Sequence, residues 1–84
     1  QKAKSFFKKW LLAERKLNDK SAIDVISRFK RVDSFINIGD SSDFDYLVTK
    51  LNKSKNFLKL SSPVKSQLRG ALKLYCEFSK VKII

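Results

Sequence analysis

The chain has 84 residues, which is enough for one domain over residues 1–84 and too short for two. A hydrophobic fraction of 43% excludes disorder for want of a core, and two Gly with one Pro are too few turn-forming residues for a β-sandwich or barrel. The 19 Lys and Arg against eight Asp and Glu give a formal net charge of +11, which favours polyanionic partners. We therefore predict an all-α fold, a compact four-helix bundle.

The first predicted helix covers residues 2–16. At 100° per residue its hydrophobic side chains gather on one side, which Phe7 and Leu11 widen, while Leu12 faces solvent. The predicted inner side carries Ala3, Phe6, Trp10, Ala13 and Leu17.

The second predicted helix begins after Asn18 and ends near Ser34. The Asn18 side chain can accept an N–H of the first turn, and Asp19 suits the positive end of the helix dipole. This helix has the clearest two-faced pattern, with an inner face of Ala22, Val25, Ile26, Phe29 and Val32.

Turn-forming residues 37–42 precede a third predicted helix, which Ser42 or Asp43 caps and which ends near Lys53. Its predicted inner edge carries Phe44, Leu47, Val48 and Leu51. A basic connection over residues 53–59 follows, and we expect Phe57, Leu58 and Leu60 to pack against the core.

The fourth predicted helix begins at Ser62-Pro63, a capping serine with proline at the first helical position, and ends near Ser79. Its predicted inner face carries Val64, Leu68, Ala71, Leu72, Tyr75 and Phe78. The aromatic rings of the chain therefore fall mostly on inner faces, which argues against a single-strand binder with exposed stacking platforms.

Few residues of the chain suit covalent chemistry. There is no His, and the single Cys76 has no imidazole to activate it, so we predict a packed structural thiol. Asp40, Asp43 and Asp45 lack the spacing of a calcium loop and are expected to cap a helix. We therefore expect no enzyme activity, no cofactor and no metal in these residues.

The sequence also bounds the setting of the chain. One cysteine allows no internal disulfide, which favours a reducing compartment, and no apolar run has the length of a membrane span. The chain starts at Gln1 and contains no Met, so we expect a piece of a longer protein. A cytoplasmic location is expected, in the nucleoid or nucleus if the chain binds DNA.

Positive charge is concentrated in the second half of the chain. Residues 1–45 carry ten basic and seven acidic side chains, whereas residues 46–84 carry nine basic side chains and Glu77 alone. Cationic stripes fall on the outer faces of the second and fourth predicted helices, where they can meet the phosphates of duplex DNA. The candidate contacts are Lys20, Ser21, Arg28, Arg31, Lys65, Arg69 and Lys73.

Three stretches carry a family resemblance: FFKKWLLAERKLNDKSAIDV, SRFKRV and SSPVKSQLRGALKLYCEF. With them the chain resembles the SAM-like core-binding (N-terminal) domain of tyrosine recombinases and phage integrases over residues 6–79. The closing helix of that family often reads Ala-Leu-Arg-x-Phe/Tyr-x-x-Phe, which is similar to residues 71–78 here.

The resemblance implies a module that clamps one side of a DNA duplex during recombination, with its second and fourth helices at the major groove. It implies contacts from Ser21, Arg28, Lys65, Arg69 and Lys73. The chain departs from the family at Val25 and Ile26, where integrases often carry an aromatic residue, and it lacks the separate domain that holds the recombinase catalytic residues.

Two alternatives stay open at this stage. The cationic stripes also fit the solvated faces that amphipathic helices need. A helical protein-interaction module that docks an acidic partner would instead expose an apolar patch, for which the candidates are Leu12, Phe35, Val81 and Ile83. A peptide acting on membranes is disfavoured, because the apolar faces match one another as in a bundle.

Overall fold

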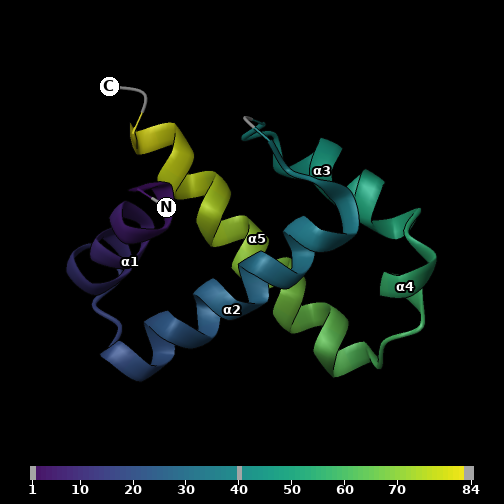
Figure 1. Cartoon of the computed structure of the whole chain (residues 1–84), viewed down its shortest axis with the longest axis horizontal. Helices are drawn as coiled ribbons and strands as arrows, with labels where there is room; N and C mark the ends of the chain where they lie inside the picture. Colours follow the sequence, from purple (N-terminus) through teal and green to yellow (C-terminus); the bar gives the residue numbers. More distant parts are fainter. Residues whose placement is uncertain (1, 40, 83–84) are drawn as a thin grey trace.

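Two long helices, α2 (Asp19–Ile36) and α5 (Ser62–Lys82), cross at the centre of the molecule (Figure 1). α1 (Lys2–Ala13) lies on one side of the crossing, and α3 (Phe44–Asn52) with the one-turn α4 (Lys55–Leu58) lies on the other. This computed structural model describes the backbone of residues 2–39 and 41–82 and the side chains of residues 6–39 and 41–80. Within those ranges the chain is all-helical, as predicted.

The helix count differs from the prediction by one. The expected connection over residues 53–59 contains α4, because the Ser54 hydroxyl accepts the Phe57 N–H at 3.4 Å and so caps an extra turn. Phe57 is fully buried and Leu60 is partly buried, as expected. The expectation for Leu58 is wrong: it lies on the outer side of this single turn and is 51% exposed.

α2 follows the sequence pattern closely. The Asn18 side chain accepts the Ser21 N–H at 2.8 Å, which confirms the predicted cap. The helix continues two residues beyond the predicted end and stops where Asn37 adopts the left-handed conformation at φ 54°. Its buried face carries Ala22, Val25, Phe29, Val32 and Ile36, while Ile26 lies partly buried at the edge.

α1 is shorter than predicted. It ends at Ala13, and Lys16 has a φ of 55°, a left-handed conformation that stops the helix before the chain turns into α2. Phe7 and Leu11 form the centre of its buried face, so the neighbouring positions are turned outward. The predicted burial of Phe6 and Ala13 is therefore wrong, and Phe6 is 49% exposed.

α3 and α5 match their predicted faces. Asp43 caps α3 by accepting the Tyr46 N–H at 3.2 Å, and Leu47 with Leu51 forms the buried edge. α5 begins at Ser62 itself and extends three residues beyond the predicted end. Its buried residues are Leu68, Ala71, Leu72, Cys76 and Phe78, with Val64 and Tyr75 partly buried beside them.

An aromatic cluster joins three of the helices. The ring of Phe7 on α1 lies 5.7 Å from that of Phe29 on α2 and 5.4 Å from that of Tyr75 on α5. Phe78 lies 5.3 Å from Phe7, and Phe29 stacks on Tyr75 at 4.2 Å. Edge-to-face and offset contacts of this kind add to the free energy of burial, so Phe7 is the side chain that locks α1 onto the crossed pair.

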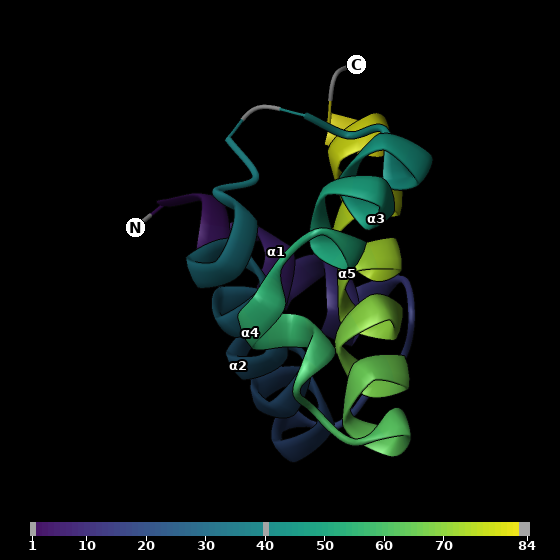
Figure 2. The same ribbon diagram turned by 90° about the vertical axis from the view of Figure 1, so that its right-hand side faces the viewer.

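Seen from the side, α2 and α5 form two layers, with α3 and α4 placed across their near end (Figure 2). The radius of gyration of 12.3 Å is close to the value of about 12 Å expected for a compact chain of this length. The two layers pack through their hydrophobic faces, so their polar faces are directed to the outside of the molecule.

Candidate nucleic-acid interface

All seven predicted contact residues lie on the two central helices. Lys20 and Arg31 on α2 and Lys73 on α5 are exposed. Arg28 and Arg69 are partly buried, and so are Ser21 and Lys65, which places these four at the margins of the buried faces. The structure thus groups the residues into one ridge on each helix.

The two ridges do not face one another. α2 and α5 pack through their buried faces, and this is the most extensive contact between helices. Side chains opposite those faces therefore point away from the shared contact. The exposed cations of the two helices diverge, and only the partly buried ones lie near the margins of the contact between them.

Lys65, Arg69 and Lys73 form what we call the α5 ridge. They are spaced four residues apart, so they stand one above the other along one side of the helix. The partly buried stems of Lys65 and Arg69 lie along the protein surface, which limits the freedom that their charged ends lose on binding. No Asp or Glu occurs anywhere in residues 46–76.

Glu77, the first carboxylate that follows the α5 ridge on the same helix, already forms an ion pair. Glu77 follows Lys73 by one turn, and its Oε2 lies 3.8 Å from Nη1 of Arg15 on α1. The other ion pair among the described residues joins Lys8 to Asp19 at 3.9 Å. None of the seven predicted residues forms an ion pair within the described part of the chain, so the charges of the α5 ridge remain available to a partner.

The ridge on α2, formed by Lys20, Arg28 and Arg31, is of mixed sign. Asp24 is exposed one turn from both Lys20 and Arg28. The guanidinium carbon of Arg31 lies 5.9 Å from the ring centre of Phe35, a cation–π contact that holds this side chain against its own helix. α2 therefore offers a weaker field than α5.

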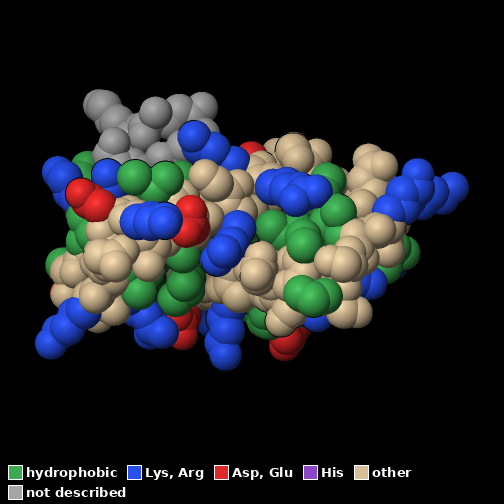
Figure 3. Space-filling view, turned by 90° about the horizontal axis from the view of Figure 1, so that it is seen from below, with side chains coloured by type: hydrophobic (Ala, Val, Ile, Leu, Met, Phe, Trp, Pro, Cys, Tyr) green, Lys and Arg blue, Asp and Glu red, His purple; other side chains and the backbone are tan. Residues whose placement is uncertain are grey.

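The surface view agrees with this difference between the two halves of the chain. Figure 3 shows Asp and Glu among the Lys and Arg side chains over the left and centre of the face, whereas the right-hand end shows Lys and Arg without carboxylates. That end corresponds to α4 and the start of α5 in Figure 1. On this face, the part of the acid-free span (residues 46–76) that forms α4 and the start of α5 is therefore also free of carboxylates at the surface.

Cys76 is buried in the core, 2% exposed, as predicted for a packing thiol. Burial raises the pKa of the Cys76 thiol; the positive charge of Lys80 opposes this shift, and the carboxylates of Asp43 and Glu77 add to it. A thiol with a raised pKa is a poor nucleophile at neutral pH.

The predicted acidic cluster serves helix formation. Asp43 is the cap of α3, Asp45 is exposed in its first turn, and Asp40 lies outside the described residues. Nowhere in the described part of the chain do three His, Cys, Asp or Glu side chains gather as metal ligands would.

The predicted apolar patch is partly accounted for. Leu12 and Phe35 are both partly buried and pack against the core, so the expectation that Leu12 faces solvent is wrong. The side chain of Val81 and the whole of Ile83 lie outside the described residues, as does the side chain of Ala3.

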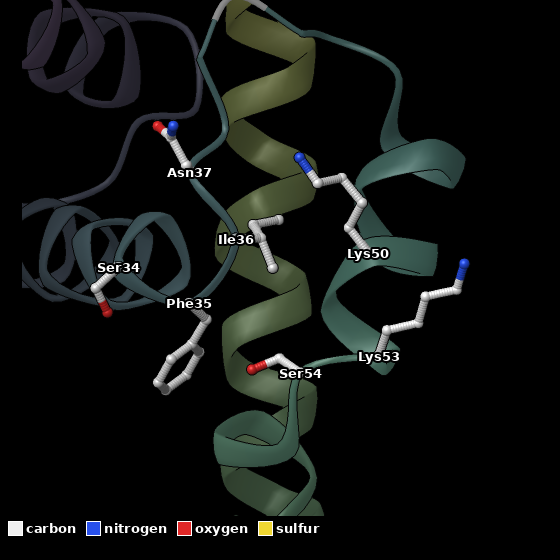
Figure 4. A pocket seen from close by; sticks show the side chains of 7 residues that line it. All are labelled: Ser34, Phe35, Ile36, Asn37, Lys50, Lys53 and Ser54. Carbon is white, nitrogen blue, oxygen red and sulfur yellow. The ribbon is translucent and has the colours of Figure 1, made fainter.

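One surface feature is absent from the sequence-based prediction. An open hollow of about 500 Å³ lies between the ends of two helices (Figure 4). It is lined by residues 34–36 of α2, by the C-cap residue Asn37, and by Lys50, Lys53 and Ser54. Its lysines belong to the acid-free span, which is the only sequence signal for it. The hollow itself depends on how α2 and α3 pack.

In comparisons with known proteins, the chain matches no family model, and at a significant level it matches no curated protein and no solved structure. Among the helices in the described ranges, none combines the length and apolar character needed to cross a membrane.

Proposed function

We propose that this chain is a non-catalytic module that binds duplex DNA, with the α5 ridge as its main contact and the ridge on α2 at the flank. The observation that carries the proposal is the uninterrupted line of unpaired cations on α5, in a stretch of the chain, residues 46–76, that holds no Asp or Glu. An ordinary solvated helix face mixes both signs of charge.

The dimensions of the α5 ridge fit a duplex. Lys65 and Lys73 are eight residues apart, which is about 12 Å along a helix, and the major groove is also about 12 Å wide. Each phosphate that a Lys or Arg side chain neutralises releases condensed counterions, which supplies the affinity. The resemblance of residues 61–78 to integrase core-binding domains supports the same assignment.

This module should discriminate only weakly between DNA sequences. Arginine matches the guanine edge with a planar fork, whereas lysine acts as a point charge on phosphate. The chain has 19 Lys and Arg in total, and only Arg15, Arg28, Arg31 and Arg69 are arginines. Since Arg15 is paired with Glu77 and Arg31 rests on Phe35, two arginines remain for base edges.

A titration with a fluorescent duplex of about 20 base pairs, at about 50 and about 200 mM salt, tests the proposal. If about five phosphates are neutralised, the slope of log affinity against log salt is about −4 to −5, and affinity falls roughly 250- to 1,000-fold between the two conditions. An affinity that stays flat with salt would contradict duplex binding through the cationic ridge.

A parallel titration with polyglutamate distinguishes duplex binding from the alternative function, the docking of an acidic protein partner. The chain should prefer duplex DNA over this flexible polyanion, because the rigid ridge meets regularly spaced phosphates. A clear preference for polyglutamate would instead favour the module that docks an acidic protein partner.

A further inference from the structure

We propose that the hollow between the ends of α2 and α3 is a second phosphate site, which seats one backbone phosphate of the bound DNA through Lys50, Lys53 and Ser54. The inference rests on the proposed function and extends the contact surface to a part of the molecule beyond the two ridges.

The two lysines are held by the last turn of α3. Lys50 is partly buried, and its ammonium lies 5.5 Å from the ring centre of Tyr46. Lys53 is the C-cap residue, and its N–H donates to the Lys50 carbonyl at 3.1 Å. Figure 4 shows the Lys50 side chain reaching from α3 toward the end of α2, whereas the Lys53 side chain starts at the rim of the hollow and extends away from α2.

Ser54 supplies a neutral donor. Its hydroxyl oxygen accepts the Phe57 N–H at 3.4 Å, so its own proton is left to donate, and Figure 4 shows this hydroxyl directed into the hollow. Ser34 differs, because its hydroxyl donates to the Arg31 carbonyl at 2.6 Å and is already used. The Lys50 ammonium and the Ser54 hydroxyl are therefore directed toward an anion in the hollow, and the exposed Lys53 reaches it after a change of rotamer.

The balance of charge at the hollow favours an anion. The C-termini of α2 and α3 contribute about half a negative charge each, and Asp33, which accepts the Ile38 N–H at 2.8 Å, contributes one more. Lys50 and Lys53 contribute two positive charges, and Arg31, whose guanidinium carbon lies 5.9 Å from the ring centre of the lining residue Phe35, contributes a third. One lysine would suffice to offset the two helix ends, so the surplus of about one positive charge is unexplained by helix capping alone.

The shape of the hollow favours a backbone phosphate over a free small anion. The space of about 500 Å³ is open to solvent and larger than one phosphate group. Phe35 and Ile36 give it an apolar wall, against which an adjoining sugar can lie. Lys55 and Lys59 lie between Lys53 and Lys65 in the sequence, and both are exposed. Exposed lysines therefore follow one another along the chain from the hollow to the α5 ridge.

The test compares duplex binding by the intact chain with that of the double variant Lys50→Gln/Lys53→Gln. Loss of that one phosphate contact lowers the salt slope by about 0.9, so the ratio of wild-type to variant affinity shrinks about 3.5-fold between about 50 and about 200 mM salt. The matched control is Lys9→Gln/Lys30→Gln, two exposed lysines on α1 and α2 that remove the same charge. It should keep a slope close to that of the wild type.

The outcomes separate the two proposals. If the wild type fails to bind duplex DNA, the proposed function is wrong. If it binds with a steep slope and both double variants behave alike, the hollow is no phosphate site while the function stands. A titration with pyrophosphate, followed through the amide chemical shifts of residues 50–54, tests whether the hollow binds a free anion rather than a DNA phosphate. Saturable binding of pyrophosphate as tight as that of the duplex would overturn the assignment to DNA.

Discussion

Replacement of Arg69 by Glu should weaken duplex binding roughly 10- to 60-fold at about 0.1 M salt, because it removes one counterion-releasing contact and adds a charge that repels phosphate. Arg69 is the middle member of the α5 ridge, so the reversed charge also lies within one turn of Lys65 and Lys73. Fluorescence anisotropy with a labelled duplex measures the change. Arg69→Lys should stay within about threefold of the wild type if the contact is a phosphate.

Lys9→Glu is the matched control for this experiment. Lys9 is exposed on α1, and the same reversal of charge there should change duplex affinity only a few-fold. Equal losses in Arg69→Glu and Lys9→Glu would mean that net charge alone attracts DNA. In that case the α5 ridge would have no special role.

Replacement of Phe7 by Ala should cost about 3–5 kcal/mol of the free energy of unfolding. Phe7 is fully buried, and its ring lies within 6.3 Å of four other rings, those of Trp10, Phe29, Tyr75 and Phe78. The cavity left behind would loosen α1 from the α2–α5 pair. Since about 1 kcal/mol shifts Tm by roughly 4–8 °C in a domain of this size, Tm should fall by at least about 12 °C.

The neighbouring residue provides the control for this substitution. Phe6 is 49% exposed, so Phe6→Ala should cost less than about 1 kcal/mol of the free energy of unfolding. A urea titration followed by circular dichroism measures this free energy for both variants. If the two variants lost the same free energy, the buried face of α1 would be centred elsewhere than on Phe7 and Leu11.

Two helices show how far the sequence predicts the fold: α2, which matches its prediction well, and α1, which does not. α2 combines a capping residue, Asn18, with a regular apolar period, so local and tertiary preferences agree and both its start and its face were predictable. α1 has aromatic residues at consecutive positions, Phe6 and Phe7, and the period alone does not say which one is buried. The left-handed Lys16 carries no sequence signal, because glycine is the usual residue there.

The candidate site was predictable in the same partial way. The positions of the cations along α5 follow from helical spacing, and the structure places them on one side of that helix. The divergence of the ridges on α2 and α5 depends on the packing of the two helices. The hollow beside Lys50 and Lys53 likewise exists only because two helix ends lie close together in space, so no local sequence pattern predicts it.

The two ridges and the hollow together describe a module in which a small aromatic core fixes the spacing of surface cations. The core holds α1, α2 and α5 through the rings around Phe7, and no buried side-chain nitrogen or oxygen in the described part of the chain lacks a hydrogen-bond partner. A rigid frame of this kind reduces the conformational entropy that the protein loses on binding. DNA affinity would then depend on where the lysines stand as well as on how many there are.

The most direct measurement of that claim is a titration of the isotope-labelled chain with a short duplex, followed through its amide chemical shifts. The largest saturable shifts should fall on residues 64–74 of α5, around Lys65, Arg69 and Lys73, with smaller ones near Arg28. Shifts confined to α1, or gathered around the exposed Phe6 and Ile23, would place the contact on another surface and contradict the account.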